Sequence, residues 1–183
     1  MLGTRLLKRY SIIEKLGMGT TSSVYKVLEI NSSKEFSCKH IKRRKSTAMR
    51  EINVLRKLPN DSRFPQYKET IEEEDAINIV MSHSEGIELF EWFVDIFDLG
   101  EKLSEECVKN IFIQMVNIIR ILHDCNLCHL DIKLENFIIS TDSKNTISII
   151  DFGATHSLFK NKTILSKMVG TVGYSPYETY NGS

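Results

Sequence analysis

Hydrophobic positions along the chain change their spacing, and the change separates a strand-rich first part from a helical second part. Short apolar runs through Ile30 and Ile41 are typical of strands. A three-residue repeat of apolar side chains then predicts a helix near residues 47–58 that ends before Pro59. The alternation in residues 77–81 predicts a further strand near 77–82.

A long amphipathic helix is predicted to follow Ser104. Ser104 suits the N-cap position, and the acidic pair Glu105 and Glu106 brings negative charge to the first turn, where the helix dipole favours it. Apolar side chains then recur at helical spacing, namely Val108, Ile111, Phe112, Met115, Ile118, Ile119 and Leu122. Residues 136–139 and 147–150 are predicted to form two more strands, of which the second is buried. The sequence therefore predicts an α+β fold, with a small antiparallel sheet and one helix before a mainly helical part.

Two segments in the second part carry side chains that suit phosphoryl transfer. The first contains Asp131, Lys133 and Asn136, and the second is Asp151-Phe152-Gly153. A carboxylate can accept the proton of an attacking hydroxyl, and a cation can neutralise the moving phosphoryl group. Asn136 and Asp151 offer the hard oxygen ligands that Mg²⁺ prefers. Each residue alone could equally cap a turn or end a strand, but the order of the two segments favours the catalytic interpretation.

These segments resemble the catalytic loop and the magnesium-binding motif of eukaryotic-type protein kinases, and Lys133 makes the chain more similar to the serine/threonine group. The resemblance implies a two-lobe kinase-like fold that binds ATP and Mg²⁺ between its lobes. We expect a small lobe over residues 1–81, a hinge over 82–86 and a partial large lobe over 87–183. The resemblance also implies that Asp131 and Lys133 are catalytic and that Asn136 and Asp151 hold the metal ion.

Further kinase motifs occur in the first part. The glycine-rich phosphate loop matches Leu16, Gly17, Met18, Gly19, Thr20, Thr21, Ser22, Ser23 and Val24. Ser22 replaces the usual third glycine of this loop. Residues 36–39 resemble the Val-Ala-Ile-Lys strand. The resemblance implies that Lys39 holds the α- and β-phosphates of the nucleotide and forms an ion pair with Glu51. The alternative for this pair is two solvated surface charges.

The resemblance extends to the hinge and to the end of the activation segment. Met81 occupies the gatekeeper position, His83 lies in the hinge that meets adenine, and Glu88 stands where the family often hydrogen-bonds the ribose. An exposed carboxylate at a helix start is an equally ordinary interpretation of Glu88. Residues 170–178 resemble the end of the activation segment, with residues 176–178 at the Ala-Pro-Glu position, and Thr171 is expected to position a hydroxyl substrate.

Two departures from the family pattern change what we expect of regulation and assembly. Leu130 stands where many kinases carry an arginine that binds a phosphorylated activation loop, so we expect activity that is independent of phosphorylation at Thr163 or Ser166. We expect the large lobe to be truncated after the activation segment. This leaves apolar faces of the helix after Ser104 partly exposed, and a partner chain can cover them. The alternative function is a truncated or inactive kinase-like nucleotide-binding interaction module.

Charge and hydropathy narrow the expected partners. Residues 1–58 carry 14 Lys and Arg against 4 Asp and Glu, whereas residues 59–183 carry 10 against 20. We interpret the basic run at residues 42–45 as a solvated loop and do not expect a nucleic-acid partner. No apolar run approaches the roughly 18 residues of a membrane span, and no signal-peptide core is present. We therefore expect an intracellular protein, cytoplasmic or nuclear, that has no membrane partner and acts on a protein substrate with a Ser or Thr hydroxyl.

The four cysteines fit a reducing compartment. Cys125 and Cys128, with His123 and His129 beside them, could be grouped as metal ligands. A second spaced cysteine pair is missing, so we interpret this segment as a structural helix-to-strand turn.

Overall fold

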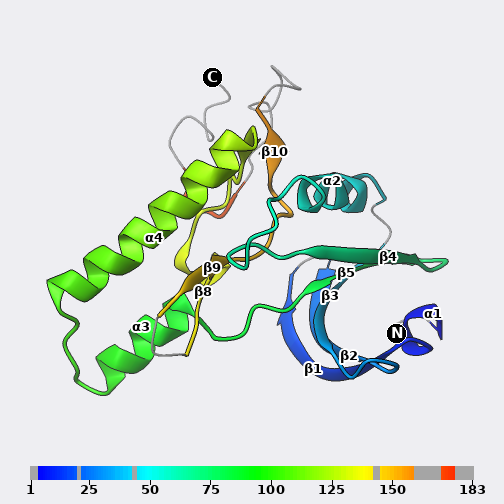
Figure 1. Ribbon diagram of the computed structural model, residues 1–183, viewed down its shortest axis with the longest axis horizontal. Coiled ribbons are helices and arrows are strands. Elements are labelled where there is room, and N and C mark those ends of the chain that lie inside the picture. Colours follow the sequence, from blue (N-terminus) through cyan, green and yellow to red (C-terminus); the bar gives the residue numbers. More distant parts are fainter. Residues whose placement is uncertain (1–3, 20–21, 43–44, 142–144, 159–169, 176–183) are drawn as a thin grey trace. The chain divides into compact units, whose positions relative to one another are not determined.

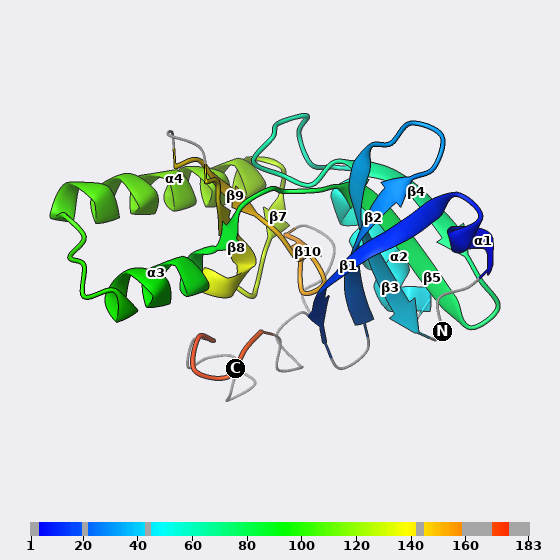
Figure 2. The same ribbon diagram turned by 90° about the horizontal axis from the view of Figure 1, so that it is seen from below.

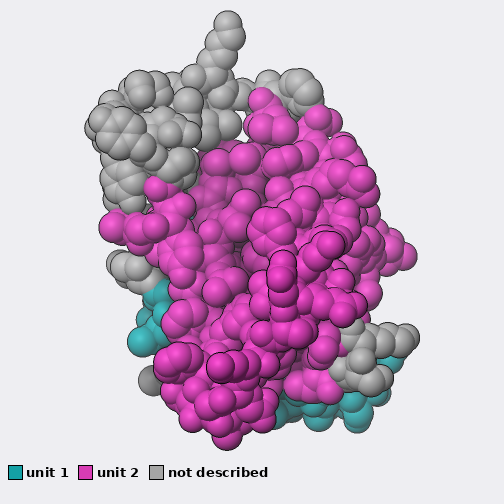
Figure 3. Space-filling view, turned by 90° about the vertical axis from the view of Figure 1, so that its left-hand side faces the viewer, with its two compact units in different colours: residues 1–56, 65–84 teal, residues 57–64, 85–183 magenta. Residues whose placement is uncertain are grey.

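A computed structural model of the chain describes residues 4–19, 22–42, 45–141, 145–158 and 170–175, which fall into two compact units. Unit 1 comprises residues 1–56 and 65–84, and unit 2 comprises residues 57–64 and 85–183 (Figure 3). The boundary between Ser84 and Glu85 falls inside the predicted hinge.

Unit 1 is a curved antiparallel sheet with one longer helix (Figure 1). Its strands are β1 (Tyr10–Met18), β2 (Ser22–Glu29), β3 (Glu35–Lys42), β4 (Tyr67–Glu72) and β5 (Ala76–Ser82), in the order β1-β2-β3-β5-β4. Helix α2 (Lys45–Leu55) follows β3, and the short helix α1 (Thr4–Leu7) precedes β1. The predicted sheet with one helix is therefore confirmed, whereas α1 was not predicted.

The two faces of the sheet in unit 1 carry different side chains, because alternate residues of a strand point to opposite sides. One face packs a buried cluster made of Leu6, Tyr10, Val27, Cys38, Ile71 and Val80. The opposite face of β3 carries Ser37, Lys39 and Ile41. The β3–β5 register pairs Ser37 with Met81 and Lys39 with Ile79, so the predicted gatekeeper and the predicted phosphate-binding lysine share this face.

Helix α2 ends earlier than the sequence predicts. It spans Lys45–Leu55, and the predicted inward positions Ile52 and Leu55 are buried. Leu58 is buried as well, but it lies beyond the helix and belongs to unit 2. A proline ring clashes with a helical conformation of the residue before it, which here is Leu58. The helix therefore ends before Leu58 for a steric reason.

Unit 2 places a small sheet between two helices (Figure 2). The sheet has the order β6-β8-β9, built from β6 (Ile87–Glu88), β8 (Phe137–Ile139) and β9 (Ile147–Ile149). Helix α3 (Leu89–Asp98) contacts β8, and helix α4 (Glu105–Asp124) contacts β9. A separate strand pair joins β7 (Leu127–Cys128) to β10 (His156–Ser157), and the 3-10 turn η1 (Leu134–Asn136) precedes β8.

Helix α4 begins as predicted, because the Ser104 hydroxyl accepts a hydrogen bond of 3.1 Å from the backbone N–H of Cys107. One side of α4 is buried in unit 2 through Ile111, Ile118 and Leu122. Another side carries exposed apolar residues, among them Val108, Phe112 and Val116. No helix in the part of the chain that the structure describes is long and apolar enough to cross a membrane.

Residues 57–64 leave unit 1 and are held in unit 2. The carbonyl of Arg63 accepts a hydrogen bond of 2.9 Å from the backbone N–H of Ile149 in β9. The side chain of Phe64 is 1% exposed. The chain therefore passes through unit 2 between α2 and β4 before it returns to complete the sheet of unit 1.

Candidate active site

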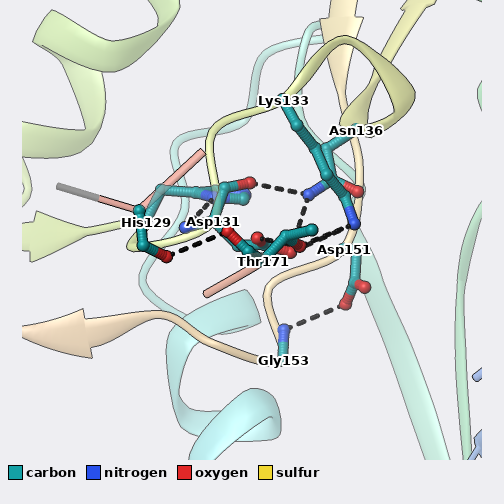
Figure 4. A network of polar contacts seen from close by, with 8 residues as sticks. His129, Asp131, Lys133, Asn136, Asp151, Gly153 and Thr171 are labelled. Carbon is teal, nitrogen blue, oxygen red and sulfur yellow. Dashed lines mark hydrogen bonds and ion pairs between the residues drawn. The ribbon is translucent and has the colours of Figure 1, made fainter. Parts of the chain in front are cut away.

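The loop between β7 and β8 gathers Asp131, Lys133 and Asn136 (Figure 4). Asn136 is 5% exposed, and its Nδ2 donates to the backbone carbonyl of Asp131 at 2.7 Å and to Oδ2 of Asp131 at 3.3 Å. Lys133 Nζ lies 3.5 Å from the same Oδ2. The amide of Asn136 thus fixes both the backbone and the carboxylate of Asp131, while the lysine keeps a cation beside that carboxylate.

Thr171 completes this group from a distant part of the sequence. Its hydroxyl donates to Oδ1 of Asp131 at 2.6 Å and accepts from Nζ of Lys133 at 3.0 Å. A hydroxyl therefore already lies between the predicted proton acceptor and the predicted phosphate-neutralising cation. The neighbouring Gly170 has φ of +102°, and a Cβ there would meet the carbonyl oxygen of Leu130 at 2.6 Å. This position needs a residue without a Cβ to keep Thr171 close to the loop.

Asp151 follows β9 and has φ of +58°, a left-handed conformation that is uncommon for a residue with a side chain. Its Oδ1 accepts from the backbone N–H of Gly153 at 3.1 Å. The backbone N–H of Ile150 donates to the carbonyl of Asn136 at 2.9 Å. This last bond ties the segment that carries Asp151 to the segment that carries Asn136, within one unit.

The buried side chain of His129 contacts the loop that carries Asp131. The ring is 2% exposed, contacts Phe152 edge to face at 5.4 Å between centroids, and offers Nδ1 to the backbone N–H of Asp131 at 3.3 Å. Burial lowers the pKa of His129, and the nearby Asp151 carboxylate opposes that shift. The imidazole is therefore neutral near pH 7, as its role as a hydrogen-bond acceptor requires.

Glu88 lies at the end of β6 and is partly buried rather than an exposed carboxylate. Burial raises the pKa of Glu88, and the carboxylates of Glu91 and Glu135 raise it further, whereas Lys133 lowers it. Its environment therefore makes the ionised form costly. The predicted contact with a ribose stays a prediction.

In unit 1, Lys39 and Glu51 form the predicted ion pair. Lys39 Nζ lies 2.7 Å from Oε1 of Glu51, and the two side chains are 9% and 2% exposed. The alternative of two solvated surface charges is therefore wrong. The short connection between β3 and α2 does not prevent the contact.

The glycine-rich loop joins β1 and β2. Within it, Thr20 and Thr21 lie outside the described residues. Ser22 already belongs to β2 and has no positive φ, so the serine that replaces the third glycine carries no backbone strain. A Cβ at Gly17 would meet nothing within 4 Å. Packing against the part of the chain that the structure describes therefore does not explain this glycine, whereas close approach of a phosphate to the backbone would.

The residues named for Mg²⁺ fit that ion by the chemistry of their donors. Asp131 offers oxygen atoms to Asn136, so only the Nδ2 side of the Asn136 amide can face them, and Oδ1 points elsewhere. Oδ1 of Asn136 and the carboxylate of Asp151 are hard oxygen ligands of the kind that Mg²⁺ shares with phosphates. No group of three or more His, Cys, Asp or Glu side chains that could hold a metal ion occurs among the residues described.

One sequence prediction needs correction, and others fall on residues that the structure does not describe. Asn136 was predicted to begin a strand, but it ends η1, because its amide turns back to the carbonyl of Asp131. The predictions for residues 176–178 and for Thr163 and Ser166 concern residues outside the described ranges.

One residue beside the predicted hinge was not anticipated from the sequence. Ser37 of β3 contacts the hinge residue His83, with 3.0 Å between Oγ and Nδ1.

The sheet-and-helix unit and the loop around Asp131 together define a protein-kinase-like α+β protein. Comparison with known proteins agrees, because residues 10–182 match the family model of the protein kinase domain. The chain belongs to the protein kinase family.

Known relatives of the chain include plant calcium-dependent protein kinases. Calcium-dependent protein kinase 27 of Arabidopsis thaliana is 28% identical over 186 residues, which cover 97% of this chain and 38% of that protein. Calcium-dependent protein kinase 22 of the same plant is 30% identical, over 96% of this chain and 37% of its own length. Calcium-dependent protein kinase 7 of Oryza sativa subsp. japonica is 31% identical, over 94% and 32%. The chain thus spans about a third of the length of these relatives.

Proposed function

We propose that this chain transfers the γ-phosphate of ATP to a serine or threonine hydroxyl of a protein substrate. The observation that carries the proposal is the contact group of Asp131, Lys133 and Thr171, in which a hydroxyl donates to the carboxylate and accepts from the ammonium group. Membership of the protein kinase family supports the same reaction. Lys133 and Thr171 support the choice of an aliphatic hydroxyl as acceptor.

Each residue has a separate task in the proposed reaction. Asp131 accepts a hydrogen bond from the substrate hydroxyl, orients it and takes its proton as the bond to phosphorus forms. Lys133 lies beside the transferred group and offsets its negative charge. In unit 1, Lys39 holds the α- and β-phosphates, and Glu51 fixes the position of its ammonium group. Asn136 and Asp151 would hold Mg²⁺, which supplies positive charge to the phosphates when bound.

Substitution Asp131→Asn tests the proposal, because it keeps the size of the side chain and removes the proton acceptor. The measurement is transfer of labelled γ-phosphate from Mg·ATP to a basic protein substrate by the purified 183-residue chain. We expect a loss of about 10²-fold or more, in line with the usual contribution of a positioned base. Asp98→Asn, an exposed residue at the end of α3, is the matched control and should transfer phosphate like the unchanged chain. A folded chain that binds nucleotide but transfers nothing would contradict catalysis and favour an interaction module.

We further propose that activity does not depend on phosphorylation of Thr163 or Ser166. Leu130 replaces the arginine that would bind a phosphorylated loop, and a leucine side chain cannot form charge-assisted hydrogen bonds to a phosphate. The double variant Thr163→Ala, Ser166→Ala should therefore match the unchanged chain in the same transfer assay. Collapse of its activity would overturn this part of the proposal.

A further inference from the structure

Ser37 is a polar residue at a position where the kinase motif has alanine. The Val-Ala-Ile-Lys pattern aligns with residues 36–39, which places a hydroxyl in this chain where the motif has a methyl group. The side chain is half-buried, so its hydroxyl needs a hydrogen-bond partner to offset the loss of water.

The partner of Ser37 is His83, which is 46 positions away in the sequence. Ser37 Oγ lies 3.0 Å from Nδ1 of the imidazole. The register of the sheet explains the approach, because Ser37 pairs with Met81 across β3 and β5, and His83 is the second residue after Met81. The pairing of Ser37 with Met81 and the contact of Ser37 with His83 bring these three residues together at the end of β5.

This group lies on the same face of β3 as Lys39. A strand rises about 3.3 Å per residue, so Ser37 is about 7 Å from Lys39 along the strand. If the ammonium group of Lys39 holds phosphates, a ribose can span that separation, and the base of the nucleotide then reaches Ser37, Met81 and His83. All of these residues belong to unit 1.

The hydrogen bond also limits the motion of the His83 ring. A histidine side chain outside a strand can adopt several rotamers, and fixing one of them before the ligand arrives lowers the entropy lost on binding. A flat imidazole fixed in this way offers an aromatic face or edge to a nucleobase.

We propose that Ser37 is a positioning residue for the nucleobase: its hydroxyl fixes the imidazole of His83, and that ring contacts the base of the bound nucleotide. The proposal rests on the proposed kinase function, because Lys39 locates the phosphates. It assigns base recognition in this chain partly to a pair of side chains.

The test compares two ligands that differ by the nucleoside. Mg·ATP carries a base, whereas Mg·tripolyphosphate has the phosphates alone, and calorimetry gives the dissociation constant of each for the full chain. Ser37→Ala should weaken Mg·ATP binding about three- to tenfold, the usual effect of one lost hydrogen bond, and leave Mg·tripolyphosphate within about twofold. Ser32→Ala is the matched control, since this exposed hydroxyl in the β2–β3 turn bonds to Glu29, and it should change neither constant.

A double-mutant cycle with His83→Phe decides whether the two side chains act as a unit. Phenylalanine keeps an aromatic ring but has no ring nitrogen, so Ser37→Ala should cause no further loss of Mg·ATP affinity in that background. Losses that multiply, or a Ser37→Ala variant that weakens both ligands equally, would overturn the proposal. An unchanged chain that binds tripolyphosphate but gains nothing from the nucleoside would overturn it as well and leave the phosphate site intact. A chain that binds neither ligand would contradict the proposed function and, with it, this proposal.

Discussion

Glu88 is a single carboxylate whose surroundings favour its neutral form. Burial and the nearby Glu91 and Glu135 raise the pKa of Glu88 above the value of 4.5 for a free glutamate. The folded protein then binds this proton more tightly than the unfolded chain does. The stability that Glu88 contributes is therefore complete below about pH 4.5 and is lost as the pH rises through the folded pKa.

Glu88→Gln should raise the thermal unfolding midpoint at pH 7.5 by about 1–3 °C, because it removes a charge that is ionised at a cost. The gain should shrink as the pH falls towards 4.5, where the glutamate of the unchanged chain is itself protonated. Thermal unfolding followed by circular dichroism at several pH values measures both effects. Glu101→Gln, an exposed carboxylate after α3, should leave the midpoint unchanged at each pH. A gain that is constant with pH would contradict the assigned cause.

Residue identities predicted some contacts and could not reveal others. The pairing of Lys39 with Glu51 was predicted because both occur in motifs with known partners. Ser37 and His83 stand in two separate motifs, neither of which predicts a contact between them, and only the register of β3 against β5 brings them together. A contact between side chains that are distant in sequence and belong to no common motif cannot be predicted until the pairing of the strands is known.

At the scale of elements, β6 depends on one glycine for its place beside β8. Gly86 has φ of +141°, and a Cβ there would lie 2.2 Å from the carbonyl oxygen of Ile139 and 2.8 Å from Cγ2 of Ile138. The pairing of Ile87 with Ile139 and of Glu88 with Ile138 requires this close approach. Gly86 therefore keeps Glu88 at its site through backbone packing.

Gly86→Ala should destabilise the chain by about 1–3 kcal/mol, because the added methyl group forces β6 away from β8 and strains the backbone. Gly17→Ala is the matched control for stability, since the same substitution meets open space there and should stay within about 0.5 kcal/mol. Urea unfolding of both variants measures the difference. Equal midpoints for the two variants would show that β6 tolerates a side chain at this point.

The elements with strong periodicity were predicted well, and the short ones were not. Helix α4 and its Ser104 cap follow from apolar spacing and capping chemistry, which act within a few residues. The turn η1 at Asn136 was mistaken for the start of a strand, because the deciding bond runs to the carbonyl of Asp131. Helix α1 contributes the buried Leu6, yet four residues give no measurable period.

At the scale of the whole molecule, residues 57–64 should hold the chain together after a cut. Phe64 is buried, and Arg63 is bonded to β9, so a chain cleaved between Ser84 and Glu85 keeps part of its first fragment in unit 2. A chain with an engineered protease site at this boundary should, after complete cleavage, still elute from a size-exclusion column as one species. Phe64→Ala should weaken that association, because burial of an aromatic ring supplies much of it. Separation of the unaltered fragments in native buffer would contradict the expectation.

The same passage through unit 2 limits how members of the family can exchange parts. Unit 1 is not one stretch of sequence, so a chimaera that takes this unit from a relative needs junctions after residues 56, 64 and 84. A single crossover at the hinge would bring along the donor's residues 57–64, which would then have to fit a β9 with which they did not evolve. Recombination at the hinge alone is therefore a poor way to combine these two units, and residues 57–64 should be inherited with the helical half of the molecule.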